Sequence, residues 1–493
     1  MHKFEKLLNQ LFLIIMSILL FAPILLRDKK HSSARNTSDL PITVEKPKDI
    51  SLKDVKGMHD VKEELKQYIE FFTKRDVYLE RGATLPKGVL FQGPPGCGKT
   101  HIARCIAGEC NVPFINVNCS SMNDMFVGVG ANKIRRVFAL ARKNSPCIIF
   151  MDEIDSIGAK RSSFSNNIEH SNNLNAMLVE MDGFQKTESI FIIAASNRAE
   201  SLDPALMRSG RFDRHLHIDK PNEDERGEIF KMYVDKIKMQ PTQNINEIIK
   251  YLSSNTPGVS CADIANIVNL AAIISVRKKT KFVTREHLME AYDEHVIGMK
   301  RESRTMCDRE LEIVAYHEAG HAILGYMLDT SSPPIKVSIV PRGKDALGFS
   351  QPKPETKYLY TKDELLSDIV VLYGGRAAEQ IFFDSVTTGA SDDIERATKI
   401  AYQMVTTFGL EDGIGCINHN DKDKIFSKKG DDINSQVDEI LHSVYDYALK
   451  LLKKHKKDVA RLAKLLLKKK TITDKDIKIV FGDELNNKYH IDI

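Results

Sequence analysis

The chain has 493 residues, 42% of them hydrophobic and 28% charged, which is typical of a folded, mostly soluble protein of about two to four domains. Its net charge of +4 is too small to indicate nucleic acid as the partner. The eight cysteines include no CxxC pair, and this pattern favours reduced thiols over a disulfide framework.

The first segment in chain order is a hydrophobic stretch. Residues 11–26 read LFLIIMSILLFAPILL without a charged side chain, and Leu7 and Leu8 extend the run. A membrane-spanning helix needs about 20 residues, so the stretch is long enough. A cleaved signal peptide is the alternative, but the basic flank RDKKHSSAR follows in place of an A-x-A-like site. We expect a single-pass anchor over residues 1–27, a polar linker over residues 28–50, and this flank on the cytoplasmic or matrix side.

A predicted phosphate-binding loop follows a short apolar strand within KGVLFQGPPGCGKT, residues 87–100. Glycines let backbone N–H groups surround phosphate oxygens, and the N-terminus of the following helix favours negative charge. In the GxxxxGK[ST] pattern, Lys99 is placed to reach the β- and γ-phosphates of ATP and Thr100 to bind Mg²⁺. The predicted nucleotide-binding residues of this loop are Gly93, Pro94, Pro95, Gly96, Cys97, Gly98, Lys99 and Thr100.

Two further apolar segments end in polar residues that suit ATP hydrolysis. Residues 148–151 lead into Asp152 and Glu153. At the end of a buried strand, Asp152 would hold Mg²⁺ and Glu153 would polarise the attacking water. The alternative is a strand that ends in an ordinary polar turn. A third strand, IFIIAASNR, ends at Asn197, whose amide could orient the water against the γ-phosphate.

Within the stretch MRSGRFDRH, Arg211 and Arg214 lie in a short loop that also carries Gly210. One interpretation is a pair of solvated side chains. The other is a pair of arginine fingers, which in a ring of ATPases reach the nucleotide of the neighbouring subunit.

Two histidines stand four residues apart in VAYHEAGHAILGYM, residues 314–327. Positions i and i+4 of an α-helix share a face, so His317 and His321 could bind one Zn²⁺ ion. Glu318 follows the first histidine and is placed to act as a general base on a water there. The alternative is a buried helix with two hydrogen-bonded core histidines, which the small and apolar flanking residues also suit.

The segments GPPGCGKT, MDEID, ASNR and SGRFDR together resemble the AAA+ ATPases. With HEAGHA on the same chain, the sequence resembles the FtsH family of membrane-bound, ATP-dependent zinc proteases, which includes the mitochondrial AAA proteases. The resemblance extends from about residue 51 to residue 480, and PRGK, LGF and YLYTK are most similar to the mitochondrial branch. The chain departs from the family at Ser209, where proline is usual, and has room for one span where bacterial members carry two.

The resemblance implies further site residues. It implies a substrate-gripping pore loop at Phe126, Val127 and Gly128, within MFVGVGA. It also implies a third zinc ligand in TTGASDDIERAT, where the matching position is Asp393. Asp392 is the adjacent competitor for this role. Glu379 is a weaker competitor, and it could instead contact a zinc ligand without binding the zinc ion itself.

We therefore expect an α/β AAA+ ATPase domain with a parallel sheet and helices on both faces over residues 51–221. A helical lid over 222–300, a mainly α-helical zinc metallopeptidase domain over 301–480 and a tail over 481–493 complete the expected order. The resemblance implies a hexamer, of one chain or mixed with paralogues, that uses ATP with Mg²⁺ and one Zn²⁺ per subunit to unfold and degrade polypeptides at a membrane. We expect this membrane to be the inner membrane of a mitochondrion or of a mitochondrion-derived organelle, with the bacterial plasma membrane as the alternative. A membrane-bound unfoldase or assembly chaperone without peptidase activity is the alternative.

Overall fold

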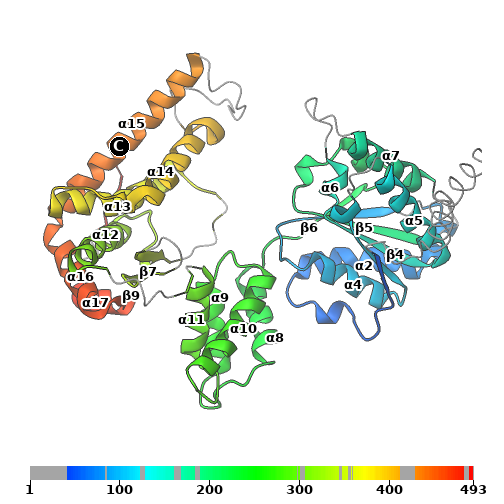
Figure 1. Ribbon diagram of the computed structural model, residues 1–493, viewed down its shortest axis with the longest axis horizontal. Helices are drawn as coiled ribbons and strands as arrows, with labels where there is room; N and C mark the ends of the chain where they lie inside the picture. Colours follow the sequence, from blue (N-terminus) through cyan, green and yellow to red (C-terminus); the bar gives the residue numbers. More distant parts are fainter. Residues whose placement is uncertain are drawn as a thin grey trace, which may run out of the picture. The chain divides into compact units, whose positions relative to one another are not determined.

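The structure is a computed structural model. It describes residues 42–83, 86–122, 128–159, 168–183, 189–296, 298–299, 306–342, 347–353, 357, 359–410, 428–481 and 488–491. The predicted anchor over residues 1–27 and the predicted pore residues Phe126 and Val127 lie outside these ranges. Within the part that the structure describes, no helix is long and apolar enough to cross a membrane. The chain forms two compact units, Met1–Pro221 and Asn222–Ile493 (Figure 1).

The first unit is built on a six-stranded sheet in the order β1-β3-β4-β5-β2-β6. Its strands are β1 (Ile42–Glu45), β2 (Gly88–Gln92), β3 (Phe114–Asn118), β4 (Cys147–Asp152), β5 (Ile190–Ser196) and β6 (Arg214–His217). Strands β2 to β6 pair in parallel, as predicted. The sheet is nevertheless mixed, because residues 42–45 of the predicted linker form β1 and pair antiparallel with β3. The added strand covers the otherwise free edge of β3.

Helices cover both faces of this sheet, as predicted. Leu90 and Ile149 pack with Phe138 and Met177 from the helices on one face. Phe150 follows Ile149 in the strand and so points to the opposite face, where its ring stacks on Phe114 at 5.9 Å. Figure 1 shows α2 and α4 on the side of the sheet opposite to α5 and α7. The helices of this unit are η2 (Leu52–Asp54), α2 (His59–Thr73), α3 (Arg75–Glu80), α4 (Lys99–Glu109), η3 (Cys119–Met122), α5 (Val129–Lys143), α6 (Asp155–Gly158), α7 (Ile168–Asp182), η4 (Ala199–Ser201) and η5 (Pro204–Met207).

The second unit begins with the four helices of the predicted lid. They are α8 (Glu223–Val234), α9 (Ile245–Asn255), α10 (Cys261–Arg277) and α11 (Arg285–Val296). Capping boxes start two of them, with Asn222 and Glu225 at α8 and Ser260 and Asp263 at α10. Each box satisfies backbone N–H groups that the first turn of a helix leaves unpaired. Apolar side chains from all four helices then form one buried cluster.

The remainder of the second unit is mainly helical, as predicted. Its helices are α12 (Asp308–Met327), α13 (Lys362–Phe383), η6 (Thr388–Ala390), α14 (Ser391–Gln403), the π-helix η7 (Met404–Phe408), α15 (Lys428–Lys454), α16 (Lys456–Lys469) and α17 (Asp474–Phe481). A small antiparallel sheet has the order β8-β7-β9. Its strands are β7 (Pro334–Ser338), β8 (Phe349–Pro352) and β9 (Thr471–Thr473).

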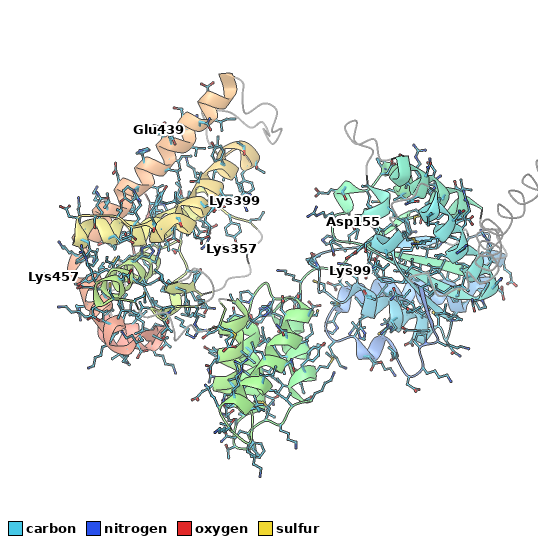
Figure 2. All side chains as sticks on the ribbon, in the orientation of Figure 1. Lys99, Asp155, Lys357, Lys399, Glu439 and Lys457 are labelled. Carbon is cyan, nitrogen blue, oxygen red and sulfur yellow. The ribbon has the colours of Figure 1, made fainter. Side chains whose placement is uncertain are left out.

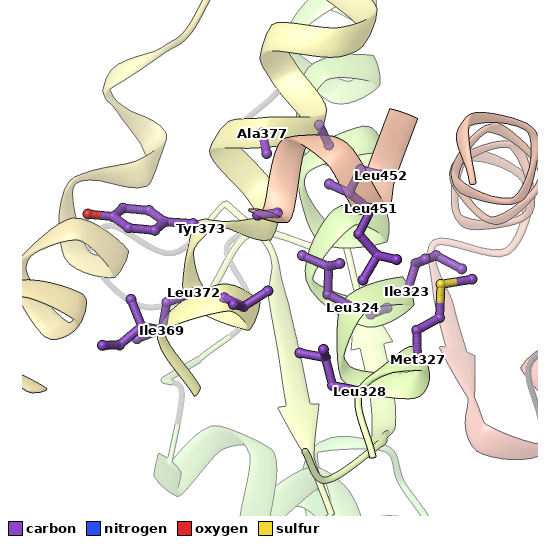
Figure 3. Packing of buried hydrophobic residues seen from close by; sticks show 14 of the residues in the cluster. Ile323, Leu324, Met327, Leu328, Ile369, Leu372, Tyr373, Ala377, Leu451 and Leu452 are labelled. Atoms are coloured by element: carbon purple, nitrogen blue, oxygen red, sulfur yellow. The ribbon is translucent and has the colours of Figure 1, made fainter. Parts of the chain in front are cut away.

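Helices α12 and α13 make the central contact of this fold. Ile323 and Leu324 of α12 meet Ile369 of α13 and Leu452 of α15 in one buried cluster (Figure 3). The two helices approach so closely that a Cβ atom at Gly320 would lie 2.2 Å from the backbone carbonyl oxygen of residue 374. This close packing fixes α12, the helix that contains the HExxH sequence.

Part of the predicted tail packs against the end of α12. Tyr489 forms a β-bridge with Leu328, the residue that follows the helix. The ammonium group of Lys488 donates a hydrogen bond to the backbone carbonyl oxygen of Tyr326 at 2.6 Å, and Ile491 is buried. The tail therefore contributes to the position of α12.

Candidate functional site

The first candidate site lies at the carboxyl ends of β2, β4 and β5. Lys99, at the start of α4, donates hydrogen bonds from Nζ to Asn197 Oδ1 at 2.7 Å and to the carbonyl oxygens of Gly93 and Pro94 at 2.7 and 2.9 Å. Burial lowers the pKa of its ammonium group. The hydroxyl group of Thr100 donates to Asp152 Oδ2 at 3.2 Å. The fold thus brings together predicted residues from three separate segments.

The backbone of this site is shaped for a phosphate group. Gly98 stands at the N-cap of α4 with φ +86°, a left-handed conformation that glycine adopts without a steric penalty. Glu153 directly follows β4 and also has a left-handed φ, of +52°. Its N–H group donates to Asp152 Oδ1 at 3.0 Å, and its side chain is exposed. Figure 2 shows Lys99 and Asp155, the first residue of α6, in the same region of this unit. The loop and the N-terminus of α4 suit phosphate oxygens, and the carboxylate at the end of β4 suits Mg²⁺.

The two candidate arginine fingers differ in their environment. Arg211 binds Asp182, at the end of α7, with Nε to Oδ1 at 3.0 Å and Nη2 to Oδ2 at 2.7 Å. Its Nη1 donates to the carbonyl oxygen of Ala205 at 2.6 Å. Arg214, the first residue of β6, is exposed. The action of either residue on a neighbouring subunit stays a prediction.

The second candidate site joins α12 to the first turn of α14. His317 and His321 lie on one face of α12, with ring centroids 4.7 Å apart. Asp393 Oδ2 lies 3.4 Å from His317 Nε2 and 3.3 Å from His321 Nε2. One ligand atom from each of the three residues lies within 4.8 Å of the others. Asp392, the adjacent candidate, has an 81% exposed side chain that lies 4.0 Å from Arg396.

The other nitrogen of each imidazole ring is also bound. His317 Nδ1–H donates to Glu379 Oε1 at 2.7 Å, and His321 Nδ1–H donates to the carbonyl oxygen of Val371 at 2.7 Å. The carbonyl oxygen only accepts, so His321 carries its proton on Nδ1. Both Nε2 atoms therefore face Asp393 as potential metal ligands. Glu379 thus holds the ring of His317 by a hydrogen bond and does not lie among the three candidate metal ligands. This was one of the two roles that the sequence left open for Glu379.

Glu318 lies beside these three residues and is 6% exposed. Its Oε2 atom is buried and has no hydrogen-bond partner among the described residues. Burial raises the pKa of its carboxyl group. A Cβ atom at Gly348, just before β8, would lie 2.6 Å from Glu318 Oε1, so backbone closes over this carboxyl group. Two imidazole nitrogens, one carboxylate oxygen and an unpartnered acid beside them fit a catalytic zinc ion.

The charges of the second site predict a pH-dependent metal affinity. Burial alone would lower the pKa of His317, but hydrogen bonds to Asp393 and Glu379 outweigh it and raise the pKa to about 10. The same hydrogen bonds to His317 and His321 hold the pKa of Asp393 well below its usual range, against the effect of burial. In the metal-free protein, His317 is therefore protonated at neutral pH, and its Nε2 must lose this proton to bind a metal.

We expect zinc binding at pH 7.5 to release about one proton, and the apparent affinity to rise about tenfold per pH unit between pH 7 and 9. Below the raised pKa of His317, protons compete with the metal, so the affinity falls as the pH falls. Calorimetry in two buffers of different ionisation enthalpy measures the released proton. A binding enthalpy that is the same in both buffers would contradict the prediction.

Several residues around the second site escaped the sequence reasoning. They are Thr387, which binds Glu379, Gly348, which lies against Glu318, and Gly375, which lies against the ring of His317. The adjacent glycines of α13 are a signal for close helix contact, but they do not identify the neighbour. Only the packing of α13 on α12 does so.

Family models match three successive segments of the chain. The model of peptidase family M41 matches residues 304–480. The model of the ATPase family associated with various cellular activities (AAA) matches residues 89–220, and that of the AAA+ lid domain matches residues 246–290. The three matches follow one another in the predicted order.

Curated relatives match across all three parts. An ATP-dependent zinc metalloprotease FtsH of Parabacteroides distasonis is 41% identical over 88% of this chain and 64% of its own length. The mitochondrial inner membrane m-AAA protease component AFG3L2 of Mus musculus is 40% identical over 88% of this chain and 55% of its own length. The chain thus spans less than two thirds of the length of these two relatives.

A third relative is covered more fully. The ATP-dependent zinc metalloprotease FtsH 3 of Symbiobacterium thermophilum is 40% identical over 87% of this chain and 71% of its own length. An alignment of this extent and identity includes the ATPase, lid and peptidase segments. The chain therefore belongs to the FtsH family of ATP-dependent zinc metalloproteases.

Proposed function

We propose that this protein is an ATP-dependent zinc metalloendopeptidase that unfolds and degrades polypeptides. The observation that carries the proposal is the meeting of His317, His321 and Asp393 beside the unpartnered carboxyl group of Glu318. The same chain carries Lys99, whose ammonium group is held at the end of a phosphate-binding loop. A peptidase centre and an ATP site on one chain support proteolysis driven by ATP.

At the peptidase site, His317 Nε2, His321 Nε2 and Asp393 Oδ2 would hold the zinc ion. When bound, zinc lowers the pKa of a water molecule and polarises the carbonyl group of the peptide. Glu318 accepts the proton of the attacking water at its carboxylate and returns it to the leaving amine. Glu379 and the carbonyl oxygen of Val371 keep both rings in orientation.

At the ATP site, we assign Lys99 to the β- and γ-phosphates, Thr100 and Asp152 to Mg²⁺, and Glu153 and Asn197 to the attacking water. The remaining loop residues, Gly93, Pro94, Pro95, Gly96, Cys97 and Gly98, would surround the phosphates with backbone N–H groups. The hydrogen bonds that already join Lys99 to Asn197 and Thr100 to Asp152 support these roles. They bring Lys99 next to Asn197 and Thr100 next to Asp152, as binding of one nucleotide and its Mg²⁺ would require.

The assembly is also part of the proposal. Arg211 and Arg214 would act on the nucleotide of the neighbouring subunit, and this arrangement requires a ring of subunits. Membership of the AAA family supports a ring of six subunits, which are identical or mixed with paralogues. Phe126, Val127 and Gly128 would line its pore. The domain limits stay as proposed from the sequence, at residues 51–221, 222–300 and 301–480. A membrane location draws support from residues 11–26 and from the word membrane in the name of the mouse relative.

The alternative, an unfoldase without peptidase activity, has less support. Loss of any one of His317, Glu318, His321 or Asp393 would favour it, and all four are in place.

The test is degradation of a labelled folded protein and of a short unstructured peptide by the purified full chain with ATP, Mg²⁺ and Zn²⁺. We expect Glu153→Gln to lower ATP hydrolysis and degradation of the folded protein by about 100-fold, because the water loses its polarising carboxylate. Cleavage of the short peptide, which needs no unfolding, should change far less.

Glu63→Gln is the matched control, because Glu63 is an exposed residue of α2 that binds only Lys66 among the contacts described. Degradation of the folded protein by Glu153→Gln at the wild-type rate would indicate an ATP-independent peptidase. ATP hydrolysis by the wild type without cleavage of either substrate would favour the unfoldase.

A further inference from the structure

A short connection between α13 and α14 binds the carboxyl group of Glu379. The backbone N–H of Thr387 donates to Glu379 Oε2 at 2.6 Å, and its hydroxyl group donates to Glu379 Oε1 at 3.2 Å. The same hydroxyl oxygen accepts a hydrogen bond from the N–H group of Gly389 at 3.2 Å. Thr387 thereby acts as the N-cap of η6, which leads directly into α14.

The carboxyl group of Glu379 has few other ways to be held. It is 1% exposed, so water does not compete for its oxygens. The hydrogen bonds described for it come from His317 Nδ1 and from the two donors of Thr387. Burial would raise its pKa, but these bonds outweigh burial and lower it. The orientation of this carboxylate, and through it that of the His317 ring, depends on Thr387.

We infer that Thr387 is a positioning residue of the proposed zinc site that joins two metal ligands from different helices. On one side, it holds Glu379, which holds the ring of His317 on α12. On the other, its hydroxyl oxygen caps η6 and fixes the start of α14, which carries Asp393. The inference rests on the proposed function, because it assumes that His317 and Asp393 bind zinc.

Removal of the hydroxyl group should loosen both ligands together. Glu379 Oε1 would lose one donor, and the N–H group of Gly389 would lose its acceptor. Residues that orient metal ligands from outside typically change metal affinity by about 10- to 100-fold when they are replaced. The backbone N–H of residue 387 still donates to Glu379 when the hydroxyl group is removed. We therefore expect a loss of zinc affinity in the lower part of this range.

The experiment compares Thr387→Val, which keeps the shape and removes the hydroxyl group, with Thr387→Ser, which keeps the hydroxyl group. Thr398→Val is the matched control, because the Thr398 hydroxyl bonds only the carbonyl oxygen of Ile394 within α14 among the contacts described. Zinc affinity is measured on the full chain by competition with a coloured chelator, with no peptide substrate present. We expect about tenfold weaker binding for Thr387→Val, and affinities within about twofold of wild type for Thr387→Ser and Thr398→Val.

A second readout separates positioning from general damage to the fold. The thermal midpoint of the chelator-treated protein should differ little between Thr387→Val and Thr398→Val. If Thr387→Val lowers the thermal midpoint strongly, Thr387→Ala replaces it in the experiment, because this variant removes the same hydroxyl group without a branched side chain. Wild-type zinc affinity in a folded hydroxyl-free variant, or equal loss in Thr387→Ser, would overturn the inference alone. Failure of the wild type to bind zinc would overturn the proposed function and this inference with it.

Discussion

Replacing Glu318 with glutamine should lower peptide cleavage by about 10²- to 10⁴-fold, the range typical for loss of a general base. Zinc affinity and ATP hydrolysis should stay close to the wild-type values. The amide of glutamine has nearly the same shape as the carboxyl group but does not take up a proton at neutral pH. The substitution therefore removes the proposed chemistry and leaves the volume of a buried site unchanged.

The environment of Glu318 explains why the effect should be large. Its Oε2 atom has no partner among the described residues, so no bond described in the protein must break before it binds a water. Burial raises its pKa, which makes its carboxylate a stronger base than an exposed glutamate. Backbone at Gly348 limits the positions that the carboxyl group can take.

The measurement is the cleavage rate of a short peptide, with zinc content and ATP hydrolysis recorded on the same samples. Glu312→Gln is the matched control, because Glu312 is an exposed residue of the same helix. Cleavage by Glu318→Gln at the wild-type rate would assign the base to another residue. Loss of zinc together with activity would mean that Glu318 supports the metal site and not the proton transfer.

The sequence predicted the parts of both sites that depend on local spacing. His317, Glu318 and His321 lie within two helical turns, so helical geometry alone places them together. Lys99 and Thr100 likewise follow from the loop between a strand and a helix. The sheet was predicted less well, since an alternation of strands and helices indicates parallel pairing but does not reveal that residues 42–45 join its edge.

The third candidate ligand could not be assigned from spacing. Asp393 lies far along the chain from His321, and the fold brings α14 to α12 through α13 and α15, which pack against both helices. In the sequence, Asp392 was the adjacent competitor for this role and Glu379 a weaker one. Asp392 is exposed and Glu379 accepts a hydrogen bond from His317, so the geometry favours Asp393, and both observations depend on tertiary structure. Resemblance to a family supplied Asp393 where the physical chemistry of the sequence alone left three candidates.

The same dependence on helix packing leads to the second large effect. Replacing Gly375 of α13 with alanine should weaken zinc binding by about 100-fold or more, at or beyond the upper end of the range for residues next to metal ligands. A Cβ atom at this position would lie 2.3 Å from His317 Nε2 and 2.4 Å from its Cε1. Contacts below 3.0 Å force something to move, and the nitrogen that would bind zinc is the nearest atom.

The backbone should not oppose this substitution. Gly375 lies inside α13 with an ordinary helical conformation, where alanine is favoured over glycine by about 1 kcal/mol. Loss of zinc binding therefore need not come with unfolding, because we expect the side chain of His317 to give way before the backbone of α13 does. The thermal midpoint of the metal-free protein should change by only a few degrees, while added zinc should raise it far less than in the wild type.

Gly325→Ala is the matched control, since Gly325 lies in the same helix as His317 and its added Cβ atom would meet its nearest neighbour at 3.4 Å, an ordinary contact distance. Its zinc affinity should equal that of the wild type. If Gly375→Ala binds zinc normally, the ring of His317 must have another position from which Nε2 still reaches the metal. The close approach of α13 would then be a matter of packing alone. If it loses zinc while its helices remain intact, the absence of a side chain at residue 375 is a requirement of the metal site, set by a helix that supplies no ligand.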